Sequence, residues 1–142
     1  MRGIVLDTNL VSEQRHARPD PNVAAWVARQ RPDDLFLTAT VVGELALGIA
    51  SLAAGKRRSD MEAWLRTLVE ERFAGRILVY DTGAGLAYGR LVAAARARGL
   101  DPSVSDAQIA AVAKSNTMAV ATRNVRNFEP LGVAVINPWQ GG

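Results

Sequence analysis

The stretch that decides the fold is Ile4-Val5-Leu6-Asp7-Thr8-Asn9, near the start of the chain. Three apolar residues lead directly into a carboxylate and then into two small polar side chains. The pattern predicts a short buried strand over residues 3–6 that delivers Asp7 at its carboxyl end. Ligands of open α/β sheets bind outside the carboxyl ends of the strands. Asp7 is therefore better placed for chemistry than for packing.

The rest of the chain alternates short apolar runs with stretches of helical spacing. Apolar residues recur at intervals of three and four around Trp26, and again in the segments that follow residues 40 and 60. Between these segments the pattern predicts strands over residues 35–37, 77–79, 118–121 and 133–136. Strands that alternate with helices indicate a mostly parallel sheet with right-handed crossovers. We therefore expect a single α/β domain over residues 1–142, with about five strands in its central sheet.

Capping residues predict where several helices begin. Thr38 or Thr40 can cap the helix that follows the second predicted strand. Ser105 and Gln108 have the spacing of a capping box, which predicts a helix that starts at Ser105. The charged segment 55–58 is interpreted as an exposed turn.

The composition excludes several kinds of site. Hydrophobic residues make up 49% of the 142-residue chain, which is enough for an ordinary core without disulfides or a structural metal. The chain has no Cys, so thiolate zinc sites, iron–sulfur clusters, cysteine catalysis and disulfides are excluded. The single histidine, His16, excludes mechanisms that need two, and its charged surroundings indicate an exposed loop.

The charge is mildly basic, with a net value of +3, and all but two of the 17 cationic residues are Arg. Guanidinium groups suit bidentate contacts to phosphate, although a bias toward Arg in the genome explains their number equally well. No apolar run approaches the ~18 residues that span a bilayer. The N-terminal segment also lacks the apolar centre of a signal peptide. We expect a soluble cytoplasmic protein with no membrane partner.

Three acidic residues and one amide are expected to meet at one edge of the sheet. Asp7 ends the first strand, and Glu44 and Asp106 lie near the starts of two later helices. Asn124 follows the fourth strand. Clustered carboxylates repel one another unless a cation is present. Oxygen ligands select hard cations such as Mg²⁺, which keeps several waters and also binds phosphate oxygens. The natural substrate of such a site is a phosphodiester.

Taken singly, each of these residues has an ordinary explanation. Asp7 and Asp106 could simply cap or begin a helix, and Glu44 could be an exposed helix residue. Gly43 and Gly48, however, leave room beside Glu44 for a ligand to approach. The case for a site rests on the acids lying together, which depends on the predicted parallel sheet.

Four stretches of sequence carry a specific resemblance that covers essentially the whole chain. In chain order they are IVLDTNLVSE, VVGELALGIA, SVSDAQIAAVA and ATRNVRNFEPLGVAVINPW. Together they resemble the PIN-domain ribonucleases and, more narrowly, the VapC-type toxins of bacterial toxin–antitoxin pairs related to the FitB proteins. The resemblance implies a PIN-like three-layer α/β/α fold and an endoribonuclease that depends on Mg²⁺ or Mn²⁺.

The resemblance also implies roles for single residues. Asp7, Glu44 and Asp106 would be the catalytic acids that bind the metal. Thr8 and Asn9 would lie beside the metal as supporting groups that orient its ligands or waters.

The chain departs from the family pattern after the fourth predicted strand. Related proteins commonly carry a fourth acid where this sequence has Asn124, and related toxins often carry Asp where it has Asn127. An amide oxygen can contact a metal or its waters but adds no charge, so we expect one tightly bound ion. Asp81 and Asp101 are possible substitutes, although both fit better as turn or loop residues.

Partners are implied by the same resemblance. Toxins of this family are inhibited by a small antitoxin that is encoded alongside the toxin. The C-terminal segment of the antitoxin lies in a groove near the acidic site. The toxins also usually form homodimers. The substrate would be RNA. Arg123 and Arg126 flank the expected site and could contact RNA phosphates or be ordinary surface charge. Phe128 and Trp139 could stack on bases, although packing roles are expected for both.

Three other functions compete with this interpretation. A phosphoacceptor receiver domain would need an early acidic pair and a Lys near the last strand, which this chain lacks. A catalytically weak or inactive PIN-fold RNA-binding module is favoured by Asn124 and opposed by the three acids. A structure-specific DNA nuclease would need more acids and longer substrate-gripping segments. The leading hypothesis is hydrolysis of RNA by a metal-activated water, which would leave a 3′ hydroxyl.

Overall fold

The computed structural model describes residues 3–141, and a parallel sheet of five strands runs through its centre in the order β3-β2-β1-β4-β5. Neighbouring strands are parallel in every pairing, as predicted. β3, β4 and β5 are shorter than the apolar runs that predicted them, because an apolar run does not show where the ladder of hydrogen bonds ends. The strands are β1 (Ile4–Leu6), β2 (Leu35–Thr38), β3 (Ile77–Leu78), β4 (Ala119–Ala121) and β5 (Val135–Ile136).

β1 is the central strand, and it is buried, as its apolar sequence predicted. Ile4 pairs with Leu35 of β2 on one side and with Ala119 of β4 on the other. Val5 and Leu6 are buried almost completely, at 0% and 1% exposure. A continuous apolar run is typical of a parallel strand that is covered on both faces.

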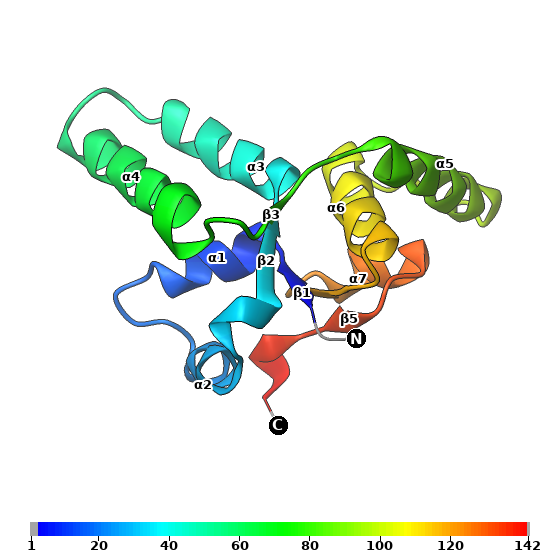
Figure 1. Ribbon diagram of the computed structural model, residues 1–142, viewed down its shortest axis with the longest axis horizontal. Coiled ribbons are helices and arrows are strands. Elements are labelled where there is room, and N and C mark those ends of the chain that lie inside the picture. Colours follow the sequence, from blue (N-terminus) through cyan, green and yellow to red (C-terminus); the bar gives the residue numbers. More distant parts are fainter. Residues whose placement is uncertain (1–2, 142) are drawn as a thin grey trace.

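Helices cover both faces of the sheet and make the predicted three layers. Figure 1 shows α3 and α4 on one side of the strands, and α5 and α6 on the other. The helices are α1 (Thr8–Gln14), α2 (Pro21–Arg29), α3 (Ala39–Ala50), α4 (Lys56–Thr67), α5 (Thr82–Ala97), α6 (Val104–Ser115) and α7 (Val125–Phe128). A π-helical turn, η2 (Leu68–Arg72), continues α4. Three short 3₁₀ turns are η1 (Pro32–Asp34), η3 (Glu129–Leu131) and η4 (Pro138–Gln140).

The order of the strands creates a switch point between β1 and β4. From β1 the chain moves outward through β2 to β3, and it then returns past both strands to pair β4 with β1. Because parallel crossovers are right-handed, this reversal of direction sends the later helices to the opposite face. A crevice forms at such a point, outside the carboxyl ends of the two strands. The fold therefore predicts where a ligand would bind, before any side chain is considered.

Two of the predicted helix starts need correction or refinement. Thr38, rather than Thr40, caps α3, since its side-chain oxygen accepts a hydrogen bond from the backbone N–H of Val41 at 3.1 Å. Ser103, rather than Ser105, caps α6, and its hydroxyl oxygen accepts from the N–H of Asp106 at 3.1 Å. The predicted capping box at Ser105 was wrong because Ser103, three residues before Asp106, caps the helix two residues earlier.

Two helical segments were not predicted at their true positions. The segment 55–58 was interpreted as a turn, but Lys56 begins α4 and its Nζ lies 2.7 Å from Asp60 Oδ2, one turn along the helix. Gly55 provides the sharp change of direction, with φ of 151°. α1 was also missed, because the polar residues between Thr8 and Gln14 conceal the buried pair of Leu10 and Val11.

α5 and α6 pack closely because both present alanine to their neighbours. Ala84, Ala87 and Ala95 of α5 are buried, as are four alanines of α6: Ala107, Ala110, Ala111 and Ala113. Small side chains let helix axes approach, which keeps the start of α6 next to the carboxyl ends of the strands. Within residues 3–141, no helix combines the length and hydropathy needed to cross a membrane.

Candidate functional site

Asp7 and Thr122 lie side by side at the switch point, where β1 and β4 end. Leu6 and Ala121 are paired in the sheet, so the next residue of each strand is brought to the same place. The backbone N–H of Asp7 donates to the carbonyl of Ala121 at 3.0 Å, and the Thr122 hydroxyl donates to Asp7 Oδ2 at 2.7 Å. Asp7 is 4% exposed and Thr122 is fully buried. Sequence reasoning passed over Thr122, although its place directly after β4, in step with Asp7, was a usable signal.

The carboxylate of Asp7 is held on several sides. Its Oδ1 accepts from the backbone N–H of Thr8 at 2.8 Å, and its Oδ2 also accepts from Asn9 Nδ2 at 3.2 Å. Asp7 therefore caps α1, as the ordinary explanation required. A helix cap requires neither burial of the carboxylate nor a hydrogen bond from the Thr122 hydroxyl. Capping alone therefore does not account for the arrangement.

Glu44 is joined to Asp7 through Thr8. The Thr8 hydroxyl donates to Glu44 Oε1 at 2.7 Å, which connects the start of α1 to the second turn of α3. A Cβ atom added to Gly43 or Gly48 would meet no atom within 4 Å, so the space beside Glu44 is open, as the sequence indicated. Thr8 thus acts as a bridge between the two acids.

Asp106 is the third residue of α6 and lies in its first turn, as predicted. A second bridge links its helix to that of Glu44, since the hydroxyl of Thr40 donates to Gln108 Oε1 at 3.1 Å. Sequence reasoning used Gln108 only as a capping residue and missed this contact. The bridge fixes α3 against α6 and so fixes the two acids relative to one another.

The three acids form what we call the acidic centre: Asp7, Glu44 and Asp106. Burial raises the pKa of Asp7, and the negative charges of Asp106 and Glu44 raise it further. The hydrogen bonds from Thr122 and from the N–H of Thr8 oppose that shift. Within residues 3–141, no Lys, Arg or His side chain forms a salt bridge with any of the three acids. The acidic centre is therefore a place of uncompensated negative charge.

The donor set fits a hard divalent cation. Its side-chain oxygens are carboxylates, with the Thr8 and Asn9 side chains beside them. Across residues 3–141, no three Asp, Glu, His or Cys side chains stand in a ready-made metal cage. Mg²⁺ is usually held by one or two carboxylates together with waters and substrate phosphates, rather than by such a cage.

The predicted supporting amide at Asn124 does not join the acidic centre through its side chain. Its backbone N–H donates to Thr122 Oγ1 at 2.9 Å, and the N–H of Arg123 donates to Asn9 Oδ1 at 3.4 Å. Asn124, Arg123 and Arg126 instead line a neighbouring hollow. Asn127 lies between that hollow and a second one that contains Asp106.

The remaining candidate residues have the structural roles that were expected. Asp81 caps α5, since its Oδ1 accepts from the N–H of Ala84 at 2.9 Å. Asp101 is exposed in a loop, with Oδ1 3.9 Å from Arg96 Nε. Phe128 is fully buried, which confirms its packing role, and His16 is exposed after the end of α1. Trp139 is partly buried, with the guanidinium carbon of Arg123 5.6 Å from its ring centroid.

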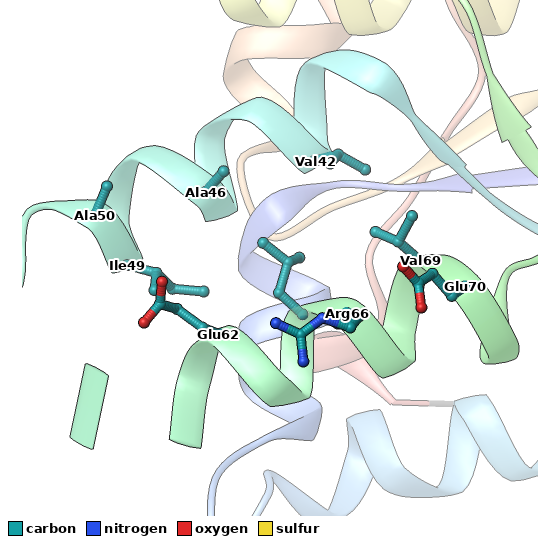
Figure 2. A pocket seen from close by; sticks show the side chains of 9 residues that line it. Val42, Ala46, Ile49, Ala50, Glu62, Arg66, Val69 and Glu70 are labelled. Carbon is teal, nitrogen blue, oxygen red and sulfur yellow. The ribbon is translucent and has the colours of Figure 1, made fainter. Parts of the chain in front are cut away.

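Two further cavities lie around α3 and α4. One of about 270 Å³ begins at Thr8 and Glu44 and runs between α1, α3 and α4. A second, of about 360 Å³, lies between α3 and the α4–η2 segment and shares Ile49 with the first. Figure 2 shows Val42, Ala46 and Ala50 along α3, opposite charged side chains of α4. We call this second cavity the α3–α4 groove; it has an apolar wall with charge along its rim.

Comparison with known proteins assigns most of the chain to one protein family. The PIN domain family matches residues 4–131. The chain is 42% identical over 137 residues to VapC ribonuclease Y4jK of Sinorhizobium fredii, which covers 96% of this chain and 98% of that protein. It is 38% identical over 136 residues to toxin FitB of Neisseria gonorrhoeae, with the same coverage of both chains.

A solved structure agrees with this assignment. The chain superimposes on the crystal structure of FitAcB from Neisseria gonorrhoeae with a TM-score of 0.90 and 38% identity, over 96% of this chain and 98% of that one. The resemblance and the three-layer parallel fold are thus confirmed. The chain belongs to the PIN-domain family, in the group that contains the VapC and FitB proteins.

Proposed function

We propose that this protein is an endoribonuclease toxin that hydrolyses RNA phosphodiesters with a divalent cation at the acidic centre. The cation would be Mg²⁺, with Mn²⁺ as an alternative, and Asp7, Glu44 and Asp106 would hold it. The names of the relatives, VapC ribonuclease and toxin FitB, support the reaction and the biological role.

The observation that carries the proposal is the buried carboxylate of Asp7 at the switch point, with two further acids beside it and no salt-bridge partner among residues 3–141. The Thr122 hydroxyl and the Thr8 N–H hold the two oxygens of Asp7 in fixed directions. Thr8 also holds Glu44 through its hydroxyl. These bonds prepare the oxygens before the substrate arrives, so little reorganisation is needed during the reaction.

When bound there, a divalent cation would lower the pKa of a water and neutralise charge on the phosphate. Asp106 and Glu44 are less constrained than Asp7 and are suited to orient that water. Attack of a water oxygen on phosphorus would form one P–O bond and break the bond to the 3′ oxygen, and the proton lost by the water would balance the proton that the 3′ oxygen takes up. The products then carry a 3′ hydroxyl and a 5′ phosphate. No side chain is needed as a covalent nucleophile, which agrees with a chain that lacks Cys.

The test is cleavage of a pool of structured and unstructured RNAs by wild-type protein and by Asp106→Asn, with Mg²⁺ or Mn²⁺ and with EDTA. We expect cleavage only by the wild type with metal, and 3′-hydroxyl products. Cleavage that persists in Asp106→Asn or in EDTA would contradict the proposal. A 2′,3′-cyclic phosphate would show that the RNA 2′ hydroxyl is the nucleophile, which would overturn the water mechanism.

The second candidate function is binding of RNA without cleavage. Asn124 favours it, because an amide stands where relatives commonly have a fourth acid and adds no charge to the metal site. RNA binding by the wild type together with an absence of cleavage under every metal condition would assign this function instead.

An antitoxin is the proposed protein partner, as expected from the resemblance to toxin–antitoxin pairs. The cavity that begins at Glu44 and the α3–α4 groove share Ile49 and could hold one continuous segment of a partner chain. The apolar wall and charged rim fit an amphipathic helix. The variant Ala50→Arg would place a charge in the groove while leaving the acidic centre intact. It should weaken inhibition by the cognate antitoxin and leave RNA cleavage unchanged.

A homodimer is proposed as the working assembly. Four large apolar side chains are more than half exposed: Leu47, Val79, Leu86 and Val104. Contiguous exposed apolar side chains mark interaction surfaces, and we propose that some of these four lie in the dimer interface. Light scattering of the wild type and of Leu86→Glu tests this proposal. A dimer that the variant weakens is the expected result, and a wild-type monomer at all concentrations would contradict it.

A further inference from the structure

A polar hollow of about 360 Å³ lies next to the acidic centre, between α7 and η4. We call it the amide hollow. Its polar lining consists of two guanidinium and four amide side chains: Arg123, Asn124, Arg126, Asn127, Asn137 and Gln140. None of the residues between 3 and 141 that line it is an Asp or a Glu. Its volume falls within the range of roughly 300–1,000 Å³ that is typical of small-ligand sites.

In the described part of the chain, most of these polar side chains form neither a salt bridge nor a hydrogen bond, with the exception of Asn137. Among residues 3–141, the guanidinium groups of Arg123 and Arg126 form no salt bridge. Arg123 lies over the Trp139 ring, with its guanidinium carbon 5.6 Å from the centroid, which limits the positions of its charge. Asn137 Oδ1 accepts from the Trp139 N–H at 3.0 Å and so fixes the η4 wall of the hollow. The hollow thus combines a positioned cation with unused amide donors and acceptors.

The hollow is joined rigidly to the acidic centre. Asn124 donates its backbone N–H to the same Thr122 hydroxyl that donates to Asp7. The N–H of Arg123 donates to Asn9, which in turn donates to Asp7. Arg126 and Asn127 also line a second hollow, of about 220 Å³, in which Asp106 lies. A ligand in the amide hollow would therefore have a fixed position relative to the acids.

We propose that the amide hollow is a nucleotide subsite that receives an unpaired nucleotide of the RNA strand, next to the phosphate held at the acidic centre. The proposal deepens the nuclease function and rests on it. Arg123 and Arg126 contact the phosphates on either side of that nucleotide, because guanidinium groups match phosphate geometry. The amides of Asn127 and Gln140 contact the edges of its base.

The chemistry of the hollow favours a single strand over a duplex. Side-chain amides read base edges by paired donor and acceptor bonds. In RNA those edges are available mainly in loops, bulges and ends, because the major groove of an RNA helix is too narrow for side chains. A duplex would occupy its base edges in pairing and could not enter a hollow of this size. The subsite thus predicts cleavage in unpaired segments, with a preference at one position.

The first test measures binding in EDTA, where the proposed metal chemistry cannot occur. Fluorescence anisotropy of single-stranded and hairpin-stem RNAs is recorded against salt for the wild type, Arg123→Ala and Arg126→Ala. Arg90→Ala is the matched control, since Arg90 is an exposed guanidinium residue of α5 that does not line the hollow. Each hollow variant should weaken single-strand binding by about fivefold to tenfold and reduce the salt slope by about 0.7 per lost phosphate contact.

The outcomes separate this proposal from the nuclease proposal. Equal loss of RNA binding in Arg126→Ala and Arg90→Ala would overturn the proposed subsite. The nuclease proposal would not be affected by that result. Binding that depends on both hollow arginines, in a protein that never cuts RNA, would leave the hollow as an RNA-binding site and reject the nuclease. Tight binding of a polyglutamate peptide without RNA binding would assign the hollow to an acidic protein segment and overturn the proposal.

The second test examines sequence preference in the presence of Mg²⁺. Cleavage sites in a randomised single-stranded RNA pool are sequenced for the wild type, Asn127→Ala and Gln140→Ala. Both residues are exposed, so neither substitution should impair folding. We expect the preference at one position beside the cut to relax, while cleavage at other sequences continues. An unchanged preference in both variants would show that the amides do not read the base.

Discussion

The acidic centre and the amide hollow share one edge of the sheet but are built in opposite ways. Asp7 is 4% exposed, and its oxygens accept bonds from Thr8, Asn9 and Thr122. In the hollow, Arg126 and Asn127 are exposed and belong to the four-residue helix α7. The groups proposed for chemistry are thus anchored by buried strand ends, whereas the groups proposed to grip the RNA are exposed on a short helix. The difference predicts that the two regions can be disabled separately.

The largest effect is expected from Asp106→Asn, which removes a charge from the acidic centre without changing the size of the side chain. RNA cleavage should fall by at least about a hundredfold, as is usual when a charged group that positions a metal or the reacting atoms is lost. RNA binding in EDTA should be unchanged or slightly tighter, because one negative charge is gone. Single-turnover cleavage and anisotropy measure the two quantities.

Asp33→Asn is the control for this change, since Asp33 is an exposed carboxylate of η1 that lines none of the cavities around the site. It should cleave RNA as the wild type does. Loss of both RNA binding and cleavage in Asp106→Asn would show that the acidic centre and the amide hollow cannot be disabled separately.

The next largest effect is expected from loss of the hydrogen bond that the Thr122 hydroxyl donates to Asp7. Thr122→Val removes the hydroxyl that lowers the pKa of Asp7 but keeps the shape of the side chain, so the pKa should rise further. The ascending limb of the pH–rate profile should then move to higher pH, and the rate at neutral pH should fall by about tenfold to a hundredfold.

Thr38→Val is the matched variant for Thr122→Val, because Thr38 is also a fully buried threonine at a strand end, and its hydroxyl caps α3. It should lower the free energy of unfolding by about 1 kcal/mol without moving the pH profile. The same displacement of the profile in both variants would mean that loss of stability, not the bond to Asp7, causes it.

The burial of Asp7 predicts a pH dependence of stability in the metal-free protein. Because the folded protein raises the pKa of Asp7 above its ordinary value of 3.8, it binds a proton more readily than the unfolded chain does. The free energy of unfolding therefore decreases as pH rises through the interval between the two pKa values. Asp7→Asn lacks this contribution.

Urea unfolding of both proteins in EDTA checks the sign of this effect. The free energy of unfolding of the wild type, minus that of Asp7→Asn, should fall as the pH rises from acid toward neutral. Mg²⁺ should reverse the fall, since a bound cation favours the ionised carboxylate. Parallel curves for the two proteins would show that Asp7 keeps an ordinary pKa.

The smallest effect is expected at the bridge between α3 and α6. Gln108→Leu and Thr40→Val each break the bond that fixes the helices of Asp106 and Glu44, at a cost of about 1 kcal/mol of unfolding free energy. Metal affinity should fall several-fold in either variant. In a double-mutant cycle, the second substitution should add little to the first, whereas full additivity would show that the bridge does not act as a unit.

Much of the fold could be predicted because β1 and the helices carry regular apolar spacing. The alternation of strands and helices predicted the parallel sheet, and in such a sheet the segments that carry Asp7, Glu44 and Asp106 lie at the edge where the strands end. Helix starts were less certain, since Ser103 and Ser105 offer competing caps. α1 was hidden by its polar surface, because a helix of 7 residues, about two turns, shows too few apolar positions.

The contacts between distant side chains could not be predicted. The bond from Thr122 to Asp7 depends on the register of β4 against β1, which no local pattern reveals. The bridge from Thr40 to Gln108 depends on how α3 crosses α6. Arg123 and Arg126 were recognised as candidates for RNA contact, but the hollow that they form with four amides appears only when α7 and η4 come together.

The proposed nuclease function depends on the binding of one divalent cation by the acidic centre through Asp7. The most direct test of that binding is a titration of the wild type and of Asp7→Asn with Mn²⁺, followed by electron paramagnetic resonance in the absence of RNA. We expect one tight site in the wild type, displaced by Mg²⁺ and lost in Asp7→Asn. Equal binding of Mn²⁺ by the two proteins would contradict the account, whatever their activity toward RNA.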